Sequence, residues 1–189
     1  MIDQSLTRPP AASLRVGEDA CERTVHSLYQ RRSQEMYGFV RRLGLDDEAA
    51  SDAVQETMLR LWRELDAGTE IADPDAWTFR TLYRLGIDSH RLTRRIRGLV
   101  ERVGGRLAVA TDRGRHDGDP AQRIDVDAVW HAVDRLPERQ RAVLYLRYRT
   151  DLPYERIGLA LGITPSAARG HASTGLATLR RRLENEDGR

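Results

Sequence analysis

Apolar residues recur every three or four positions in three stretches of the first hundred residues, which is the spacing of one face of an α-helix. The clearest stretch covers residues 50–65, and Asp46 stands before it where a helix cap belongs. An earlier stripe stops at Gly44, a residue that commonly ends a helix. A later one follows Asp73 and Pro74, a cap and a first-turn proline. The pattern predicts three helices packed as a bundle.

The last third of the chain has a different organisation. Residues 153–161 predict a short helix, Gly162 begins a three-residue turn, and Thr164 and Pro165 open a longer helix. This order indicates a helix-turn-helix unit, although a helical hairpin without DNA contact has the same pattern. The residues of the longer helix predicted to face inward are Ala168, Ala172, Leu176, Leu179 and Leu183. Its predicted outward positions are Ser166, Arg169, Ser173 and Arg180, with His171 to one side.

Length and composition complete the prediction of the fold class. The chain has 189 residues, enough for one or two compact units, and shows no apolar run of the length of a membrane span or signal peptide. Residues 101–125 combine glycine, proline and charge without an apolar period, which predicts a flexible linker. We therefore expect an all-α protein of the cytoplasm. Its parts would be a poorly ordered arm over residues 1–25, a helical bundle over 26–100 and a helix-turn-helix domain over 126–185.

The charge pattern separates two surfaces. All 31 basic residues are arginines, against 29 acidic residues, so the formal net charge is +2. An acidic patch lies within residues 46–56, whereas the third predicted helix carries arginines with aromatic rings nearby. Such a basic face suits a nucleic-acid strand, and a solvated face paired with the abundant acids is the alternative. The positions concerned are Trp77, Arg80, Tyr83, Arg84, Asp88, Arg91, Arg94 and Arg95.

The sequence carries no pattern of an enzyme or of a metal site. Its five histidines lack the spacing of metal ligands, and neither a glycine-rich phosphate loop nor a nucleophile elbow occurs. Cys21 is the only cysteine, which excludes an internal disulfide and a thiolate zinc site. We therefore expect no catalytic residue, no metal and no cofactor.

Two segments resemble the bacterial extracytoplasmic function (ECF) sigma factors. The run from Asp52 to Glu56, followed by Leu61 and Trp62, resembles the D-x-V-Q-E helix with which sigma factors hold the clamp helices of RNA polymerase. The segments that resemble the second sigma DNA-binding domain are Leu136-Pro137, Arg141, Tyr154-Glu155-x-Ile157-Gly158 and Leu161-Gly162-Ile163. Both motifs stand in the order of the family, and the resemblance covers about residues 28–183.

The resemblance implies an alternative sigma factor that binds the β and β′ subunits of core RNA polymerase, directs the enzyme to promoter DNA and helps to melt it. The implied polymerase contacts are Asp52, Gln55, Glu56, Leu61 and Trp62. The implied contacts to the melted minus-ten strand are Trp77, Arg80, Arg84, Asp88, Arg91, Arg94 and Arg95. The implied contacts to the duplex minus-thirty-five element are Ser166, Arg169, His171, Ser173 and Arg180. Residues 66–73 would form the loop that captures a flipped base, and an anti-sigma factor is a further partner that the resemblance suggests.

The chain departs from the family pattern at two places. Relatives commonly carry asparagine where this chain has Arg84. The predicted recognition helix is poor in basic residues and contains Gly170 and Gly175, each of which costs roughly 1 kcal/mol relative to alanine. Two other functions therefore stay open: a helix-turn-helix regulator that binds duplex DNA alone, and a sigma-like adaptor that occupies polymerase without recognising promoters. Asp52, Gln55 and Glu56 argue against the first, and an assay with core polymerase separates the second.

Overall fold

The computed structural model describes residues 12–102 and 129–187, and this part of the chain is helical without strands, so the all-α prediction is confirmed. Side chains at residues 12–19, 90–102, 183 and 185–187 lie outside the description. The helices are α1 (Ala12–Leu43), α2 (Asp47–Asp66), α3 (Pro74–Arg102), α5 (Glu138–Tyr148), α6 (Tyr154–Leu161) and α7 (Pro165–Asp187). None of the described helices is long and apolar enough to cross a membrane.

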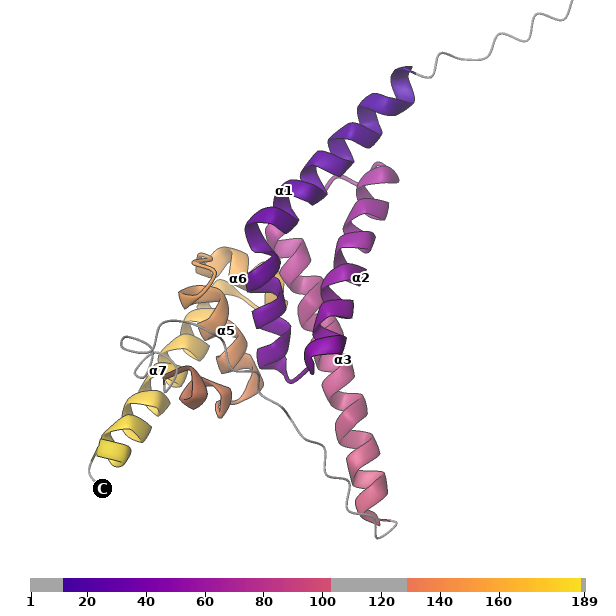
Figure 1. The fold of residues 1–189 in the computed structure, drawn as a ribbon. Coiled ribbons are helices and arrows are strands. Elements are labelled where there is room, and N and C mark those ends of the chain that lie inside the picture. Colours follow the sequence, from indigo (N-terminus) through magenta and orange to yellow (C-terminus); the bar gives the residue numbers. More distant parts are fainter. Residues whose placement is uncertain (1–11, 103–128, 188–189) are drawn as a thin grey trace, which may run out of the picture.

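Helices α1, α2 and α3 pack against one another as the predicted bundle (Figure 1). Both expected caps are present: Asp46 accepts the N–H of Ala49 at 2.8 Å, and Asp73 accepts that of Ala76 at 3.0 Å. The fully buried rings of Phe39 and Phe79 meet edge to face at 5.5 Å in the core of the bundle. The apolar periodicity thus identified the inner face of α1, of α2 and of α3 as far as its side chains are described.

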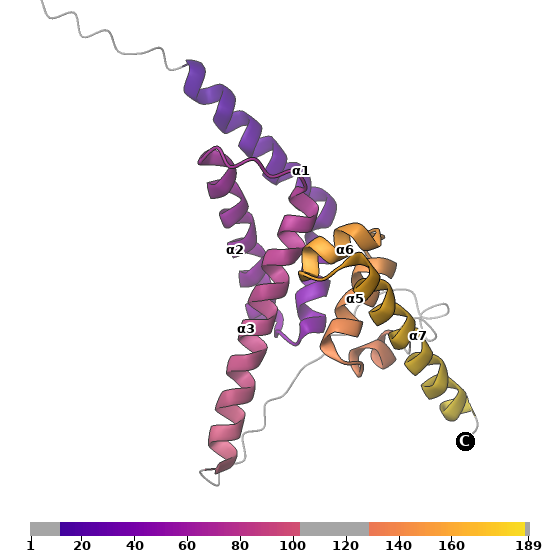
Figure 2. The ribbon, with the colours of Figure 1, turned by 180° about the vertical axis from the view of Figure 1, so that it is seen from behind.

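The N-terminal helix is longer than the sequence pattern predicted. α1 begins at Ala12, so residues 12–25 belong to a helix and not to the expected arm. This stretch follows the last proline of the N-terminal region and contains alanine, leucine, arginine and glutamate, which have high helix propensity. The start of α1 and the end of α3 extend beyond the bundle at opposite ends (Figures 1 and 2). Residues 1–11 and 103–128, which include most of the predicted linker over 101–125, lie outside the description.

Helices α5, α6 and α7 form the helix-turn-helix unit, and glycines make its turn possible. Gly162 has φ of +64°, a left-handed conformation that costs glycine little. Gly158 lies so close to the backbone at Ile163 and Pro165 that a side chain there would collide with it. Thr164 accepts the N–H of Ala167 at 3.1 Å, which confirms it as the cap of α7.

The inward face of α7 differs from the prediction at one position. Ala168, Ala172 and Leu179 are buried, but Leu176 is 42% exposed, and Gly175 is buried in its place. A Cβ atom on Gly175 would lie only 3.0 Å from a methyl group of Leu144 in α5. The glycine therefore permits α5 and α7 to approach closely, and the side chain of Leu183 lies outside the description.

The helix-turn-helix unit packs directly on the bundle, and both share one hydrophobic core. Helix α6 lies against α3 and α5 lies against α1 (Figure 2). The ring of Tyr145 in α5 packs 5.7 Å from that of Phe39 in α1, and its hydroxyl donates to the carbonyl of Glu35 at 3.0 Å. The two units that the sequence pattern separates are thus one body in this structure.

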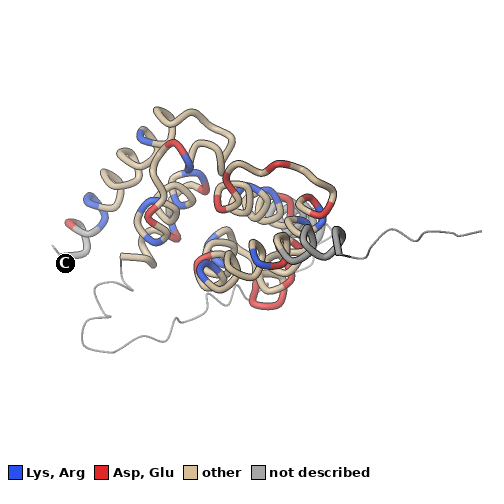
Figure 3. The backbone as a smooth tube through the Cα atoms, turned by 90° about the horizontal axis from the view of Figure 1, so that it is seen from above, with Lys and Arg blue, Asp and Glu red and all other residues tan. Residues whose placement is uncertain are grey.

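Charged groups close the edges of this interface. Acidic and basic positions are interspersed across the molecule in Figure 3, and several pair between the two units. Arg42 of α1 donates to Asp134 at 2.7 Å and lies 4.7 Å from the centre of the Trp130 ring. Arg156 of α6 binds Asp73 at the start of α3. Some of the acidic and basic residues of this chain therefore pair within the molecule.

Candidate polymerase and nucleic-acid interfaces

The outward face of α2 carries the polar residues expected to contact polymerase. Asp52 and Gln55 are exposed, and Glu56 is half-buried and paired with Arg60 at 2.7 Å. Trp62, 38% exposed, and Leu59 add apolar surface to the same helix. Exposed large apolar side chains beside acids and an amide are typical of a protein-binding face.

Leu61 departs from the role that the resemblance implied for it. Its side chain is fully buried in the core of the bundle. The buried positions of α2 recur at three and four residues, and Leu61 continues that inner stripe after Met58. Its side chain therefore supports the helix from within and offers no surface to a partner.

The basic face of α3 starts at its first turns. Trp77 is half-buried, while Arg80, Arg84 and Asp88 are exposed. The candidates further along α3 are helical, but their side chains lie outside the description: Arg91, Arg94 and Arg95.

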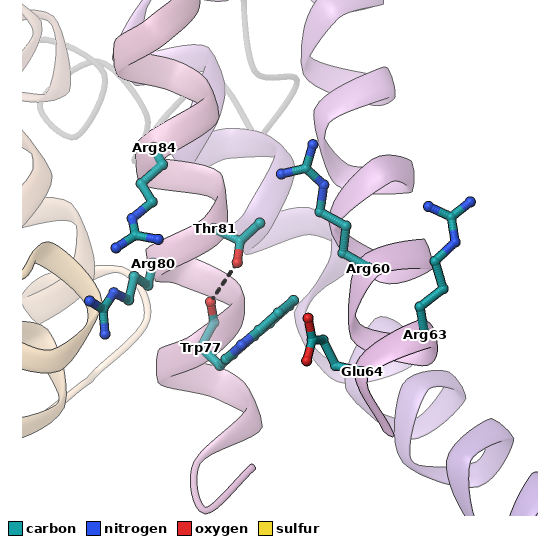
Figure 4. A pocket seen from close by; sticks show the side chains of 7 residues that line it. All are labelled: Arg60, Arg63, Glu64, Trp77, Arg80, Thr81 and Arg84. Atoms are coloured by element: carbon teal, nitrogen blue, oxygen red, sulfur yellow. Dashed lines mark hydrogen bonds between the residues drawn. The ribbon is translucent and has the colours of Figure 1, made fainter. Parts of the chain in front are cut away.

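Between α2 and α3 the side chains leave a groove of about 410 Å³ (Figure 4). This volume is in the lower part of the range of ligand pockets. Trp77 reaches from α3 toward Glu64 of α2, and its carbonyl accepts the hydroxyl of Thr81 at 3.1 Å. The lining, called the arginine groove below, is Arg60, Arg63, Glu64, Trp77, Arg80, Thr81 and Arg84. Four arginines against one glutamate attract an anionic strand, and an indole offers a stacking face for a base.

Sequence reasoning missed the part of the arginine groove that α2 contributes. Arg60, Arg63 and Glu64 lie on the same helix as the expected polymerase contacts, so the pattern assigned that helix to one partner. Arg63 and Glu64 follow Arg60 by three and four residues, a spacing that places all three side chains on one side of α2. This spacing is the only sequence signal that could have grouped them. That this side faces Trp77 depends on how α2 and α3 pack, which no spacing within one helix reveals.

The loop between α2 and α3 is anchored at its end. Asp73 accepts two hydrogen bonds from Arg156 and one from the backbone of Ala76. Burial by itself would raise the pKa of Asp73, but these hydrogen bonds outweigh it and hold the pKa below its ordinary value. Near the start of the loop, Gly68 has φ of +78° and the hydroxyl of Thr69 donates to Glu64 at 3.0 Å. The loop thus begins beside the arginine groove and ends at the interface between the two units.

The predicted base-contacting residues of α7 lie on its outer side. Ser166, Arg169, Ser173 and Arg180 are exposed, and His171 is half-buried. Among the described contacts, the guanidinium of Arg169 pairs with a residue of α6, Glu155, at 2.8 Å. Within the described residues there is no group of three or more histidine, cysteine, aspartate or glutamate side chains that could hold a metal ion.

Two models of the sigma-70 family match the two units described above. The model of sigma-70 region 2 matches residues 28–96, which include α2 and most of α3. The model of sigma-70 region 4 matches residues 127–179, which include α5, α6 and most of α7.

Two of the similar proteins are named as ECF RNA polymerase sigma factors. The chain is 27% identical over 162 residues to the ECF RNA polymerase sigma factor SigK of Mycobacterium sp. (strain JLS), covering 84% of this chain and 77% of that protein. It is 26% identical over 161 residues to the ECF sigma factor SigL of Mycobacterium tuberculosis H37Rv, covering 85% of this chain and 89% of that one.

Solved structures share the fold at a TM-score of 0.60 and 20% identity. One is CnrH in complex with the cytosolic domain of CnrY, which covers 91% of this chain and 95% of that one. Another is the sigma factor RpoE in complex with the anti-sigma factor NepR from Bartonella quintana, which covers 84% and 97%.

The chain belongs to the ECF sigma factors of the sigma-70 family. It is an alternative sigma factor, a transcription initiation factor that binds core RNA polymerase and promoter DNA. The alternatives of a stand-alone regulator and of a sigma-like adaptor are not favoured.

Proposed function

We propose that this sigma factor divides its contacts between three surfaces. The outward face of α2, with Asp52, Gln55, Glu56 and Trp62, binds the β and β′ subunits of core polymerase. An acidic face repels DNA phosphate and so suits a protein partner.

The arginine groove takes the melted minus-ten strand. Its arginines meet the phosphates, and the indole of Trp77 stacks on an unpaired base. On the sequence alone, we extend this proposed contact to the exposed Asp88 and to the later arginines of α3, Arg91, Arg94 and Arg95. The groove of four arginines around one indole is the observation that carries the proposal.

The outer side of α7 enters the major groove of the minus-thirty-five element. Ser166 and Arg169 stand in its first turns, where a recognition helix meets base edges, with His171 and Ser173 a turn later. Arg180 lies further along and reaches the DNA backbone. The protein is not an enzyme and acts in the cytoplasm beside its polymerase.

A pair of tryptophan variants tests the division of roles. Trp77→Ala is expected to weaken binding of a premelted promoter by holoenzyme roughly 5- to 150-fold, the range of one lost base stack, without loss of core binding. Trp62→Ala is the matched control on the outer face of α2 and is expected to weaken core binding instead.

The salt dependence of premelted-promoter binding by holoenzyme gives the second readout. Arg80→Ala is expected to lower the slope of log affinity against log salt for the premelted promoter by about 0.7 for one phosphate. Equal affinity and slope for wild type, Trp77→Ala and Arg80→Ala would show that the groove does not hold the strand.

A further inference from the structure

Helix α6 holds the side chain of Arg169 at two points. The Nη2 atom of Arg169 donates to Glu155 Oε1 at 2.8 Å, and its Cζ atom lies 5.5 Å from the centre of the Tyr154 ring. Both partners stand in the first turn of α6, across the glycine turn from α7. The arginine expected to meet a base is therefore already oriented by the preceding helix.

Tyr154 is itself fixed in place. Its side chain is partly buried against the core, and a second guanidinium, that of Arg147 in α5, lies 5.5 Å from the ring centre. Arg147 also donates to the carbonyl of Leu152 at 3.2 Å. One ring thus connects all three helices of the unit and gives Arg169 a rigid surface to rest on.

These contacts add little to the stability of the fold. The side chains of Arg169 and Glu155 are 55% and 62% exposed, and ion pairs at such positions are weak. Their effect is on conformational freedom, because a free arginine side chain loses much rotamer entropy when it binds. A guanidinium held by Tyr154 and Glu155 has lost part of that freedom before DNA arrives.

The charge of Glu155 also changes what Arg169 prefers to bind. A carboxylate beside the guanidinium repels a phosphate from the same place, whereas base edges carry no net charge. Arginine has five N–H donors and Glu155 accepts from one N–H of Nη2, so the second N–H of Nη2 remains, beside an N–H of Nε or Nη1, for a second partner. Two parallel donors match the O6 and N7 acceptors of guanine.

We propose that Glu155 and Tyr154 are positioning residues that aim Arg169 at a guanine of the minus-thirty-five element and away from phosphate. This inference rests on the proposed function, which places Arg169 in the major groove. It extends sequence recognition from α7 to the start of α6.

A randomised minus-thirty-five library transcribed by holoenzyme tests both statements. Arg169→Ala is expected to remove the preference for guanine at one position, a change of roughly 5- to 150-fold. Glu155→Ala is expected to weaken the preference at that same position by roughly two- to five-fold, the range of an exposed ion pair. In the double variant, loss of Glu155 is expected to add nothing to the loss of Arg169.

Two further variants separate positioning from a general effect of charge or packing. Tyr154→Phe keeps the ring and is expected to retain the preference, whereas Tyr154→Leu is expected to weaken it as Glu155→Ala does. Glu184→Gln removes one negative charge from an exposed site far along α7. It is expected to strengthen binding of unrelated duplex DNA without changing the selected bases.

The outcomes distinguish this inference from the proposed function. If Arg169→Ala leaves the selected bases unchanged, the base contact is wrong and the positioning falls with it. If Arg169→Ala changes them while Glu155→Ala and Tyr154→Leu do not, the base contact stands and the positioning alone is overturned. A Glu155→Ala effect at a different position from that of Arg169→Ala also overturns it.

Discussion

Arg156 in α6 and Asp73 at the start of α3 form a two-pronged ion pair, in which Nε and Nη2 each lie 2.5 Å from a carboxylate oxygen. Asp73 also accepts the N–H of Ala76 and so caps α3. A single carboxylate therefore stabilises the first turn of α3 and joins the helix-turn-helix unit to the bundle.

Two substitutions of Asp73 separate these roles. Asp73→Asn keeps a good cap but loses the charge, and we expect the free energy of unfolding to fall by about 1 to 2 kcal/mol. The estimate is reduced because the side chains of Asp73 and Arg156 are 22% and 36% exposed. Asp73→Ala also loses the cap and is expected to cost about 1 kcal/mol more. Urea unfolding measures both, and equal stability of Asp73→Asn and wild type would contradict the assignment.

The ion pair between Arg156 and Asp73 is expected to stabilise the protein less as the pH falls. The pKa of Asp73 lies below its ordinary value in the folded protein, so its contribution is present above the unfolded pKa of about 3.9 and is lost as the pH falls through the folded value. The difference between wild type and Asp73→Asn is therefore expected to shrink below about pH 4. As a control, Arg60→Ala breaks a pair with side chains 47% and 40% exposed and is expected to change stability by less than about 0.5 kcal/mol at pH 7.

Two glycines in helix interiors are expected to respond to alanine in opposite directions. At Gly38 in α1 a Cβ atom would collide with the hydroxyl of Tyr145, a buried side chain held by its hydrogen bond to Glu35. Gly38→Ala is therefore expected to destabilise, although alanine gains about 1 kcal/mol in helix propensity. At Gly170 in α7 no atom lies within 4 Å of a Cβ, so Gly170→Ala is expected to stabilise by roughly 0.5 to 1 kcal/mol.

Thermal unfolding of the two variants gives the comparison, and a third variant tests its cause. Tyr145→Phe removes the hydroxyl that an alanine at position 38 would meet, so it is expected to lessen the effect of Gly38→Ala. Similar stabilisation by alanine at both glycines would show that α1 and α5 are not packed this closely.

The sequence predicted what depends on neighbours along one helix. The caps Asp46, Asp73 and Thr164 and the turn at Gly162 follow from local hydrogen bonding and backbone freedom, and all four are present. Leu176 shows the limit of this approach. Spacing placed it inward, but the close approach of α5 to α7 needs Gly175 there, and such an approach is a property of two helices.

The candidate site also contains residues that one helix predicts and residues that depend on the packing of two helices. Residue type predicted the acidic patch of α2, the family resemblance predicted its polymerase contacts, and residue type and spacing predicted the arginine face of α3. Arg60 and Arg63 were not, because their place in the arginine groove depends on the packing of α2 against α3. The pairing of Arg156 with Asp73 joins residues 83 positions apart, which no periodicity connects.

We expect the protein to lose stability at alkaline pH because of two tyrosines between the units, Tyr83 and Tyr145. Burial raises the pKa of Tyr83 and of Tyr145 to about 12. Their neutral forms stabilise the fold below the unfolded pKa of about 10, and this contribution is lost as the pH rises from about 10 to 12. The double variant Tyr83→Phe/Tyr145→Phe is expected to lose less stability than wild type between pH 9 and pH 11 in urea unfolding. Parallel losses in the two proteins would place the alkaline sensitivity elsewhere.

The polymerase face can be tested without disturbing the fold. Asp52 and Gln55 are exposed and Glu56 is half-buried, so alanine at all three is expected to leave thermal unfolding nearly unchanged. The triple variant is expected to lose co-elution with core polymerase, because these side chains are the polar contacts of that face. Binding of the isolated variant to single-stranded DNA serves as the control and is expected to persist. Unchanged co-elution of the folded variant would remove α2 from the polymerase interface.

The proposed function implies that the two units separate when both promoter elements are bound at once. Helix α7 packs on α6 and α6 packs on α3, and with axes about 8–10 Å apart at each packing the two proposed DNA-binding helices lie within about 20 Å of each other. The minus-ten and minus-thirty-five elements are about 25 base pairs apart, or roughly 85 Å at 3.4 Å per base pair.

Arg156→Ala weakens the contact that holds α6 on α3, so we expect it to raise run-off transcription at limiting sigma factor by up to about five-fold, the equivalent of 1 kcal/mol. Tyr37→Phe is the control, since it removes a hydrogen bond to Asp47 within the bundle and leaves the interface intact. Output from Arg156→Ala equal to or below that of wild type, with core binding retained, would show that this ion pair does not restrain the separation.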